Sequence, residues 1–178
     1  MKTGANGGYR VEARDGATGA LLWQATTDYV TPPRNWLPPY NLLLTQSGRL
    51  YAPGSGGKLL MCANADAAAG TFAPQIFYGA ATYNANPAAY DGSIFINTPV
   101  TADAAGNLFF GFVVTGTNPA GLTSGIARVA PDRTGIWVSV ATAAPSISRS
   151  TGARPPQRRP ASCSRSTAQR SRPARGSP

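Results

Sequence analysis

Few side chains in this sequence could carry chemistry, and those that could are scattered. There is no His among the 178 residues, and the seven acidic residues include no dense Asp-x-Asp-x-Asp-Gly run of the kind that binds calcium. Cys62 and Cys163 lack the Cys-x-x-Cys spacing and stand in dissimilar regions, so we expect neither a metal ligand nor a disulfide between them. His-based triads, Cys-His pairs and His-based metal sites are therefore excluded, and we predict no catalytic residue and no metal site.

The stretch Ala52–Leu60, APGSGGKLL, has a superficial likeness to a phosphate-binding loop. Such a loop needs a glycine five residues before its second glycine, then Lys and Ser or Thr, and then a helix. Here Ala52 stands at the first position, and Leu59 follows Lys58. We therefore interpret the stretch as a hairpin turn between two strands.

The stretch Tyr78–Gly92, YGAATYNANPAAYDG, combines aromatic rings with side-chain amides. That combination can bind sugars or flat cofactors, and binding residues concentrate on loops held by a rigid scaffold. We expect a loop here and take it as the candidate contact surface for an unidentified protein or small molecule. The alternative is a connection between sheets whose tyrosines cover its own apolar edge. The candidate contact residues are Tyr78, Tyr83, Asn84, Asn86 and Tyr90.

The first 144 residues have the pattern of β-structure throughout. Short runs of Val, Ile, Leu, Phe and Tyr are separated by clusters of Gly, Pro, Asn and Asp. No helical period is sustained, and the best helix candidate is the short stretch 63–72, ANADAAAGTF. Strands are expected within residues 9–13, 21–30, 41–45, 49–53, 58–63, 93–97, 107–116, 125–130 and 136–142.

Two patterns recur along the chain, and the first is an Asp turn followed by Thr-Gly and a strand with Trp. DGATGALLW returns in shortened form as DRTGIW. Because Asp can bond the backbone ahead of it and Gly tolerates a positive φ, each copy predicts a tight hairpin, and its Trp is expected to cover the gap between neighbouring sheets. Asp103 and Asp132 are thus interpreted as turn residues rather than as a base or calcium ligands. The matched residues are Asp15, Thr18, Gly19 and Trp23 in the first copy and Asp132, Thr134, Gly135 and Trp137 in the second.

The second pattern is a turn followed by Gly-x-Leu-aromatic. It occurs in PPYNLLLTQSGRLYAPGSGG and again in INTPVTADAAGNLFFGFVVTG, with the glycines 58 positions apart. Repeats of this size, each built from a few antiparallel strands, predict a propeller or a solenoid. The matched pairs are Pro39 with Pro99, Gly48 with Gly106, Leu50 with Leu108, and Tyr51 with Phe109.

On these residues the chain resembles the quinoprotein-type β-propeller repeat, also called the pyrroloquinoline quinone (PQQ) repeat. VEARDGATGALLWQ is similar to its pattern of a small residue, Asp, Thr-Gly and Trp, and SGRLYAP and DAAGNLFFGF are similar to its accompanying strand. The resemblance covers roughly residues 9–140 and implies an all-β fold. Because closed propellers have roughly four to eight blades, it implies a partial quinoprotein-like β-propeller of about three blades.

The resemblance leaves two functions open. The first is a non-catalytic binding or scaffold module without a cofactor, since in this superfamily the repeat marks blade stacking rather than cofactor binding. The second is a fragment of a PQQ-dependent dehydrogenase, an oxidoreductase that uses PQQ and calcium. For a full-length parent protein the resemblance implies a periplasmic or extracellular location.

The C-terminal part of the chain has a different composition. Residues 1–144 carry eight Lys or Arg and all seven acids, whereas residues 145–178 carry eight Arg and no acid, Lys or aromatic residue. The basic charge therefore belongs to the tail, and the nearly neutral body has no electrostatic footprint for nucleic acid. We predict partial propeller repeats over residues 1–144 and a disordered Arg/Ser/Pro tail over 145–178, and we do not expect nucleic acid as a partner.

The tail composition has a further explanation. Arg, Pro and Ala are what G+C-rich codons give when they are read out of frame, so we interpret the tail as out-of-frame peptide that cuts off a longer propeller. A genuine disordered linker and a nucleic-acid-binding arm are the alternatives. No apolar run approaches the ~20 residues of a membrane span, and the start, MKTGANGGYRVEA, lacks the apolar region of a signal peptide.

Overall fold

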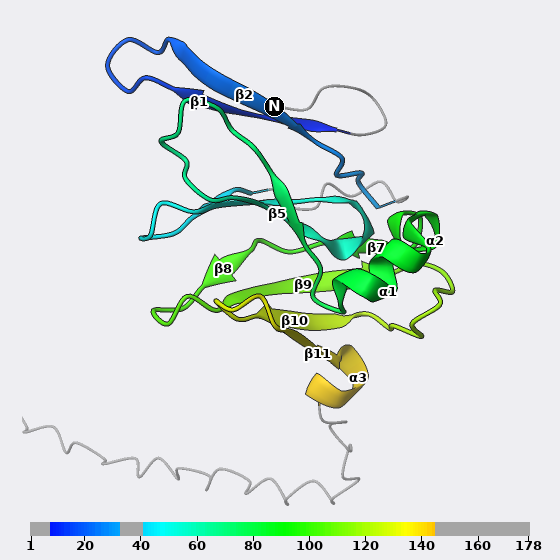
Figure 1. Cartoon of the computed structure of the whole chain (residues 1–178). Coiled ribbons are helices and arrows are strands. Elements are labelled where there is room, and N and C mark those ends of the chain that lie inside the picture. The colour runs from blue at the N-terminus through cyan, green and yellow to red at the C-terminus, as the bar shows by residue number, and fades with distance from the viewer. Residues whose placement is uncertain (1–7, 33–40, 145–178) are drawn as a thin grey trace, which may run out of the picture. The chain divides into compact units, whose positions relative to one another are not determined.

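A computed structural model describes residues 8–32 and 41–144 of the chain. Residues 1–7, 33–40 and 145–178 lie outside the described part, and with them Pro39, Cys163 and the predicted tail. Within the described part, most regular structure consists of antiparallel strands, with a few short helices (Figure 1). The prediction of a β-rich fold is confirmed to that extent.

The strands form one hairpin and two sheets. The hairpin pairs β1 with β2; the middle sheet has the order β3-β4-β5-β6; the large sheet has the order β11-β10-β9-β7, with β8 also paired to β9. The strands are β1 (Tyr9–Arg14), β2 (Leu21–Thr27), β3 (Leu43–Leu44), β4 (Leu50–Pro53), β5 (Leu59–Cys62), β6 (Ala73–Gln75), β7 (Ile94–Ile96), β8 (Thr101–Ala102), β9 (Leu108–Val114), β10 (Gly125–Val129) and β11 (Gly135–Ser139). The helices are a 3-10 turn, η1 (Ser55–Gly57), and α1 (Ala80–Ala85), α2 (Pro87–Asp91) and α3 (Val140–Ala143).

Each of the nine expected strand regions contains a strand, but several local predictions were wrong. The helix candidate at 63–72 forms turns, and the expected loop at 78–92 contains α1 and α2 instead. Pro87 stands in the first turn of α2, and the Asn86 side chain caps that turn. Both residue types are favoured at the start of a helix, which explains why α2 begins here. The short strands β6 and β8 were not predicted, because two or three residues carry no visible alternation.

The 58-residue repeat is present in the strand register. Leu43 pairs with Tyr51 in the middle sheet, and 58 residues later Thr101 pairs with Phe109 in the large sheet. The turns that precede β4 and β9 repeat in the same way. Gly48 and Gly106 have φ angles of 75° and 81°, and each donates its N–H to the carbonyl three residues earlier, at 3.0 Å in both copies. A positive φ at this position explains the Gly of the Gly-x-Leu-aromatic pattern.

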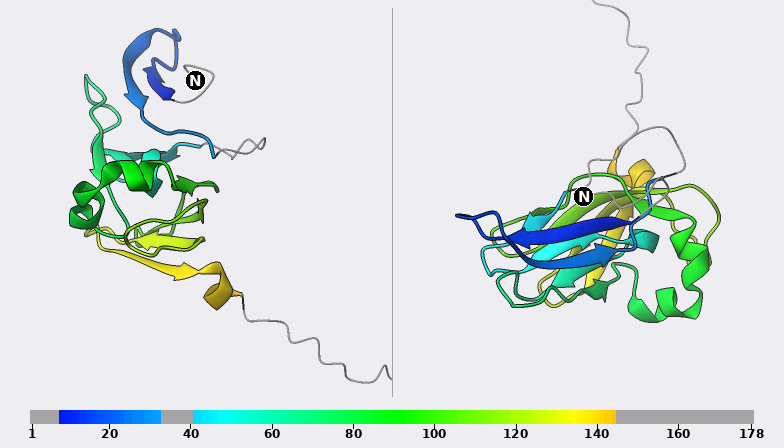
Figure 2. Two further views of the ribbon diagram at one scale, coloured as in Figure 1. Left: turned by 90° about the vertical axis from the view of Figure 1, so that its right-hand side faces the viewer. Right: turned by 90° about the horizontal axis from the view of Figure 1, so that it is seen from above.

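The middle sheet is covered on both faces. One face packs against the hairpin residues Val11 and Trp23, and the other packs against the large sheet. Figure 2 (left) shows the hairpin, the middle sheet and the large sheet as successive layers. The face toward the hairpin carries Leu50, Ala52, Leu60 and Cys62; the face toward the large sheet carries Tyr51, Leu59 and Met61, which meet Leu108, Phe110, Phe112, Ala127 and Val129.

The layers thus follow one rule of alternation. Leu50 and Leu108, which are 58 residues apart, both face the preceding layer, whereas Tyr51 faces the following one. Successive residues of a strand point to opposite faces. We call the face toward the layer that comes earlier in the sequence the backward face, and the other the forward face. The repeat therefore gives equivalent residues of the two sheets the same direction. In this head-to-tail stack of the hairpin, the middle sheet and the large sheet, the forward face of each layer packs against the backward face of the next.

We expect the Gly135→Ala substitution to destabilise this stack. A Cβ at Gly135 would overlap the carbonyl carbon and oxygen and the Cα of Phe77, which are backbone atoms that cannot yield. The free energy of unfolding should fall by at least about 2 kcal/mol in urea denaturation. Gly16→Ala is the control, because its Cβ would meet nothing within 4 Å, and it should change stability by less than about 0.5 kcal/mol. Equal stability of the two variants would contradict this packing.

Candidate functional site

The first Asp-Thr-Gly-Trp copy forms the turn between β1 and β2. Asp15 Oδ1 accepts hydrogen bonds from the N–H and the hydroxyl of Thr18, both at 2.7 Å, and Gly19 has a φ of 73°. Those hydrogen bonds hold the pKa of the exposed Asp15 carboxyl below its usual value. Trp23 is buried against the middle sheet, donates its Nε1–H to the Ala65 carbonyl at 3.1 Å, and leaves no room for a Cβ at Gly70.

The second copy forms the turn between β10 and β11, but its Trp has another position. Asp132 Oδ1 accepts from the Thr134 N–H at 2.9 Å, as a turn residue would. The Trp137 ring contacts the ring of Phe112, a residue of the same sheet, in an edge-to-face arrangement with centroids 5.9 Å apart. The exposed fraction of Trp137 is 36%. Trp23 therefore faces forward onto the middle sheet, whereas Trp137 lies on the backward face of the large sheet.

The tyrosines of residues 78–92 come together on the inside of α1 and α2. Tyr83 and Tyr90 are buried, and the Tyr78 and Tyr90 rings lie 5.0 Å apart. Asn84 is exposed, and the side chain of Asn86, also exposed, caps α2. The packing of the tyrosines agrees with a connection that covers its own apolar edge. The role of these five residues as a contact surface stays a prediction.

Sequence reasoning missed a buried polar cluster around Lys58. The stretch 52–60 is a hairpin turn, as predicted, but the Lys58 side chain is only 8% exposed. Its ammonium lies 2.6 Å from Asp28 Oδ2 and 3.8 Å from Asp91 Oδ1. It also donates to the Tyr83 hydroxyl at 2.7 Å and to Ser55 Oγ at 3.0 Å. The cluster thus joins the end of the hairpin layer, the turn of the middle sheet and the two helices.

The charges of the cluster stabilise one another. Burial alone would lower the pKa of Lys58, but hydrogen bonds to Asp28 and Tyr83 outweigh it and raise that pKa above its usual value. Burial likewise opposes ionisation of Asp28, and hydrogen bonds from Lys58 and Ser55 still hold its pKa below the usual value. A lysine that stays protonated is no nucleophile at neutral pH. The chemistry of the cluster is therefore that of an ion-paired clasp between layers.

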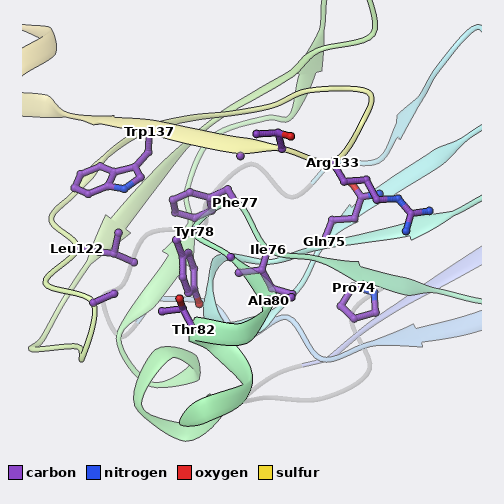
Figure 3. Close-up of a pocket in the computed structure, with 14 residues that line it drawn as sticks. Pro74, Gln75, Ile76, Phe77, Tyr78, Ala80, Thr82, Leu122, Arg133 and Trp137 are labelled. Carbon is purple, nitrogen blue, oxygen red and sulfur yellow. The ribbon is translucent and has the colours of Figure 1, made fainter.

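A groove of about 710 Å³ lies between the edge strands β6 and β11 (Figure 3). Phe77, Tyr78 and Trp137 are its aromatic residues. Gln75 and Arg133 lie at the end of the groove away from Trp137. Of the five predicted contact residues, the groove includes Tyr78, whose hydroxyl donates to the Gly56 carbonyl at 2.8 Å.

Two further features of the described residues bear on function. No three His, Cys, Asp or Glu side chains gather there as a metal ion would need. None of the helices in residues 8–32 and 41–144 has the length and apolar character to cross a membrane. Cys62 is buried, and its thiol lies 3.3 Å from the Asn64 carbonyl.

Comparison with known proteins identifies no relative: no protein-family model, no curated protein and no solved structure matches the chain significantly.

We expect the Asp28–Lys58 pair to make the free energy of unfolding decrease at acidic pH. Because the folded pKa of Asp28 lies below its reference value of 3.8, its stabilisation is present above that pH and is lost as the pH falls through the folded pKa. The urea midpoint of the Asp28→Asn variant should therefore drop less than that of the wild type between about pH 6 and about pH 3. Asp66→Asn, an exposed site outside the cluster, should follow the wild type. An Asp28→Asn profile parallel to the wild type would exclude the clasp.

Proposed function

We propose that the chain is a non-catalytic binding and scaffold module of the quinoprotein-like β-propeller type, and that it contributes about three stacked sheets to a longer assembly. The observation that carries the proposal is the difference between two equivalent strands. All four residues of β5 are buried, whereas buried and exposed residues alternate along β10, with Ile126 and Arg128 exposed. The forward face of the middle sheet is thus covered, whereas the equivalent face of the large sheet is exposed.

The open face corresponds position by position to the covered one. Leu50 pairs with Cys62 as Leu108 pairs with Val129, so Leu59 of β5 corresponds to Ile126 of β10. Leu59 is fully buried against the large sheet, whereas Ile126 is 47% exposed. Ile136, Val138 and Val140 are further exposed apolar residues after β10. An apolar face of this kind supports the stacking of a further sheet of the same type.

The chemistry of the described residues favours a module without catalysis. The one buried ammonium among them is held by two carboxylates, a tyrosine and a serine, and the acids do not gather in threes. The alternative, a fragment of a PQQ-dependent dehydrogenase, would require a calcium site with several converging oxygens, and no three acidic, Cys or His side chains gather among the described residues. We further propose a periplasmic or extracellular location for a full-length parent protein.

A tandem chain tests the stacking. In this chain, residues 1–138 are followed directly by a second copy of residues 76–144. Val138 pairs with Ile126 as Gln75 pairs with Leu59, so Val138 is equivalent to Gln75 and residue 76 can follow it. The added sheet should cover Ile126, so the unfolding midpoint should rise by about 5 °C or more and the binding of an apolar dye should decrease. The control carries Leu108→Arg in the added copy only, which places a charge on its backward face. A tandem chain no more stable than this control would refute the proposal.

A second assay separates the two functions. The chain is mixed with PQQ and calcium, and cofactor absorbance and dye-linked alcohol oxidation are recorded. The scaffold proposal predicts no oxidation above that of free PQQ with calcium. Turnover that depends on the protein would instead establish the dehydrogenase alternative.

A further inference from the structure

The groove between β6 and β11 contains a polar side chain without a partner. Only 7% of the Gln75 surface is exposed, and no hydrogen bond joins its side chain to another residue in the described part of the chain. Its amide atoms are not among the buried polar atoms that lack a partner, so they reach the solvent of the groove. It lines the groove, as Arg133 does, and Figure 3 shows both toward the end away from Trp137. The donor and the acceptor of this amide are therefore both free to bind a ligand in place of water. A ligand in the groove with both a donor and an acceptor would satisfy it.

Arg133 is a second feature that points to an anionic group. Its side chain is exposed, and no carboxylate of the described residues lies within ion-pair distance. Among the described non-glycine residues it alone has a positive φ, 72°, a conformation in which Gly would be relaxed. Arg133 lines the groove, and the planar guanidinium of an exposed arginine is suited to bind a carboxylate through two hydrogen bonds.

The opposite end of the groove is aromatic. Phe77 is buried, whereas Trp137 keeps about a third of its surface exposed and contacts Phe112 edge to face. Figure 3 shows Trp137 close to Phe77 and Leu122, away from Gln75 and Arg133. An exposed indole offers an apolar surface on which the C–H face of a sugar ring can pack. The hydroxyls of Thr82 and Thr134 also line the groove.

We propose that this groove binds a small acidic saccharide, a mono- or disaccharide that carries a carboxylate. The sugar ring packs on Trp137, its hydroxyls donate to and accept from the Gln75 amide, and its carboxylate pairs with Arg133. An aromatic carboxylate fits less well, because it offers no hydroxyl donor to the Gln75 carbonyl. The volume of about 710 Å³ lies within the usual range for small-ligand sites. This inference rests on the proposal that the chain is a binding module and gives that module a ligand class.

The test is calorimetric titration of the full chain at physiological salt with digalacturonic acid, its dimethyl ester and benzoate. Digalacturonic acid should bind, and the ester, which keeps the sugar and removes the charge, should bind about tenfold or more weakly. Benzoate should not bind measurably. Equal affinity for the acid and its ester, binding of benzoate alone, or no binding would each overturn the proposal. These arms use only the wild-type chain, so they do not depend on the folding of any variant.

Three variants locate the site. Arg133→Gly should reduce the affinity for digalacturonic acid about tenfold or more, with an unfolding midpoint within about 3 °C of the wild type because Gly is relaxed at this φ. Gln75→Leu, which keeps the side-chain size, should also reduce it about tenfold. Arg154→Gln removes a charge from the basic tail and should change nothing. If Arg154→Gln weakens binding as much as Arg133→Gly, the anion is held by the tail and the groove is excluded.

The same titration distinguishes this inference from the proposed function. Absence of saccharide binding in a chain that also fails to oxidise alcohols with PQQ would exclude the ligand class and leave the module proposal standing. PQQ-dependent oxidation would exclude the module proposal, whatever the saccharide result.

Discussion

The structure depends on burying both faces of the middle sheet. Every residue of β4 and β5 is buried, so these strands have no polar face. A sheet of this kind is stable only between two other apolar layers, because each uncovered face would expose Leu and Met side chains to water. The hairpin supplies one cover through Val11 and Trp23, and the large sheet supplies the other. The order of the layers follows the order of the chain, so short connections suffice.

The ends of the layers are joined by polar contacts that apolar packing alone would not specify. Lys58 is buried only because Asp28 and Asp91 compensate its charge from two different segments. The Tyr29 hydroxyl, at the end of the hairpin layer, donates to the Ile96 carbonyl of the large sheet at 2.8 Å. Both contacts fix how far one layer can slide over the next. The groove between β6 and β11 lies between two layers held in this way, and its shape is a consequence of their spacing.

Much of this arrangement could be predicted from the sequence, where the cause is local. The Asp15 turn and the positive φ of Gly48 and Gly106 follow from residue type, and the 58-residue spacing predicts the common strand register. The partners of Lys58 could not be predicted, because Asp28 and Asp91 are distant in sequence and neither lies in a motif. The sequence around Gln75, a single amide before the apolar residues Ile76 and Phe77, indicates only weakly that this side chain lines a groove. The two Trp motifs look alike in sequence, yet strand register, which is not a local property, places them on opposite faces.

Hydrogen exchange of backbone amides in β5 and β10 tests the head-to-tail stack most directly. Both strands lie between two neighbouring strands of their own sheet, so they differ in how many of their faces are covered. Head-to-tail stacking with an open forward face predicts that the amides of Leu59–Cys62 exchange more slowly than those of Gly125–Val129, by about tenfold or more. Equal protection of the two strands would contradict it, because the large sheet would then be as well covered as the middle sheet.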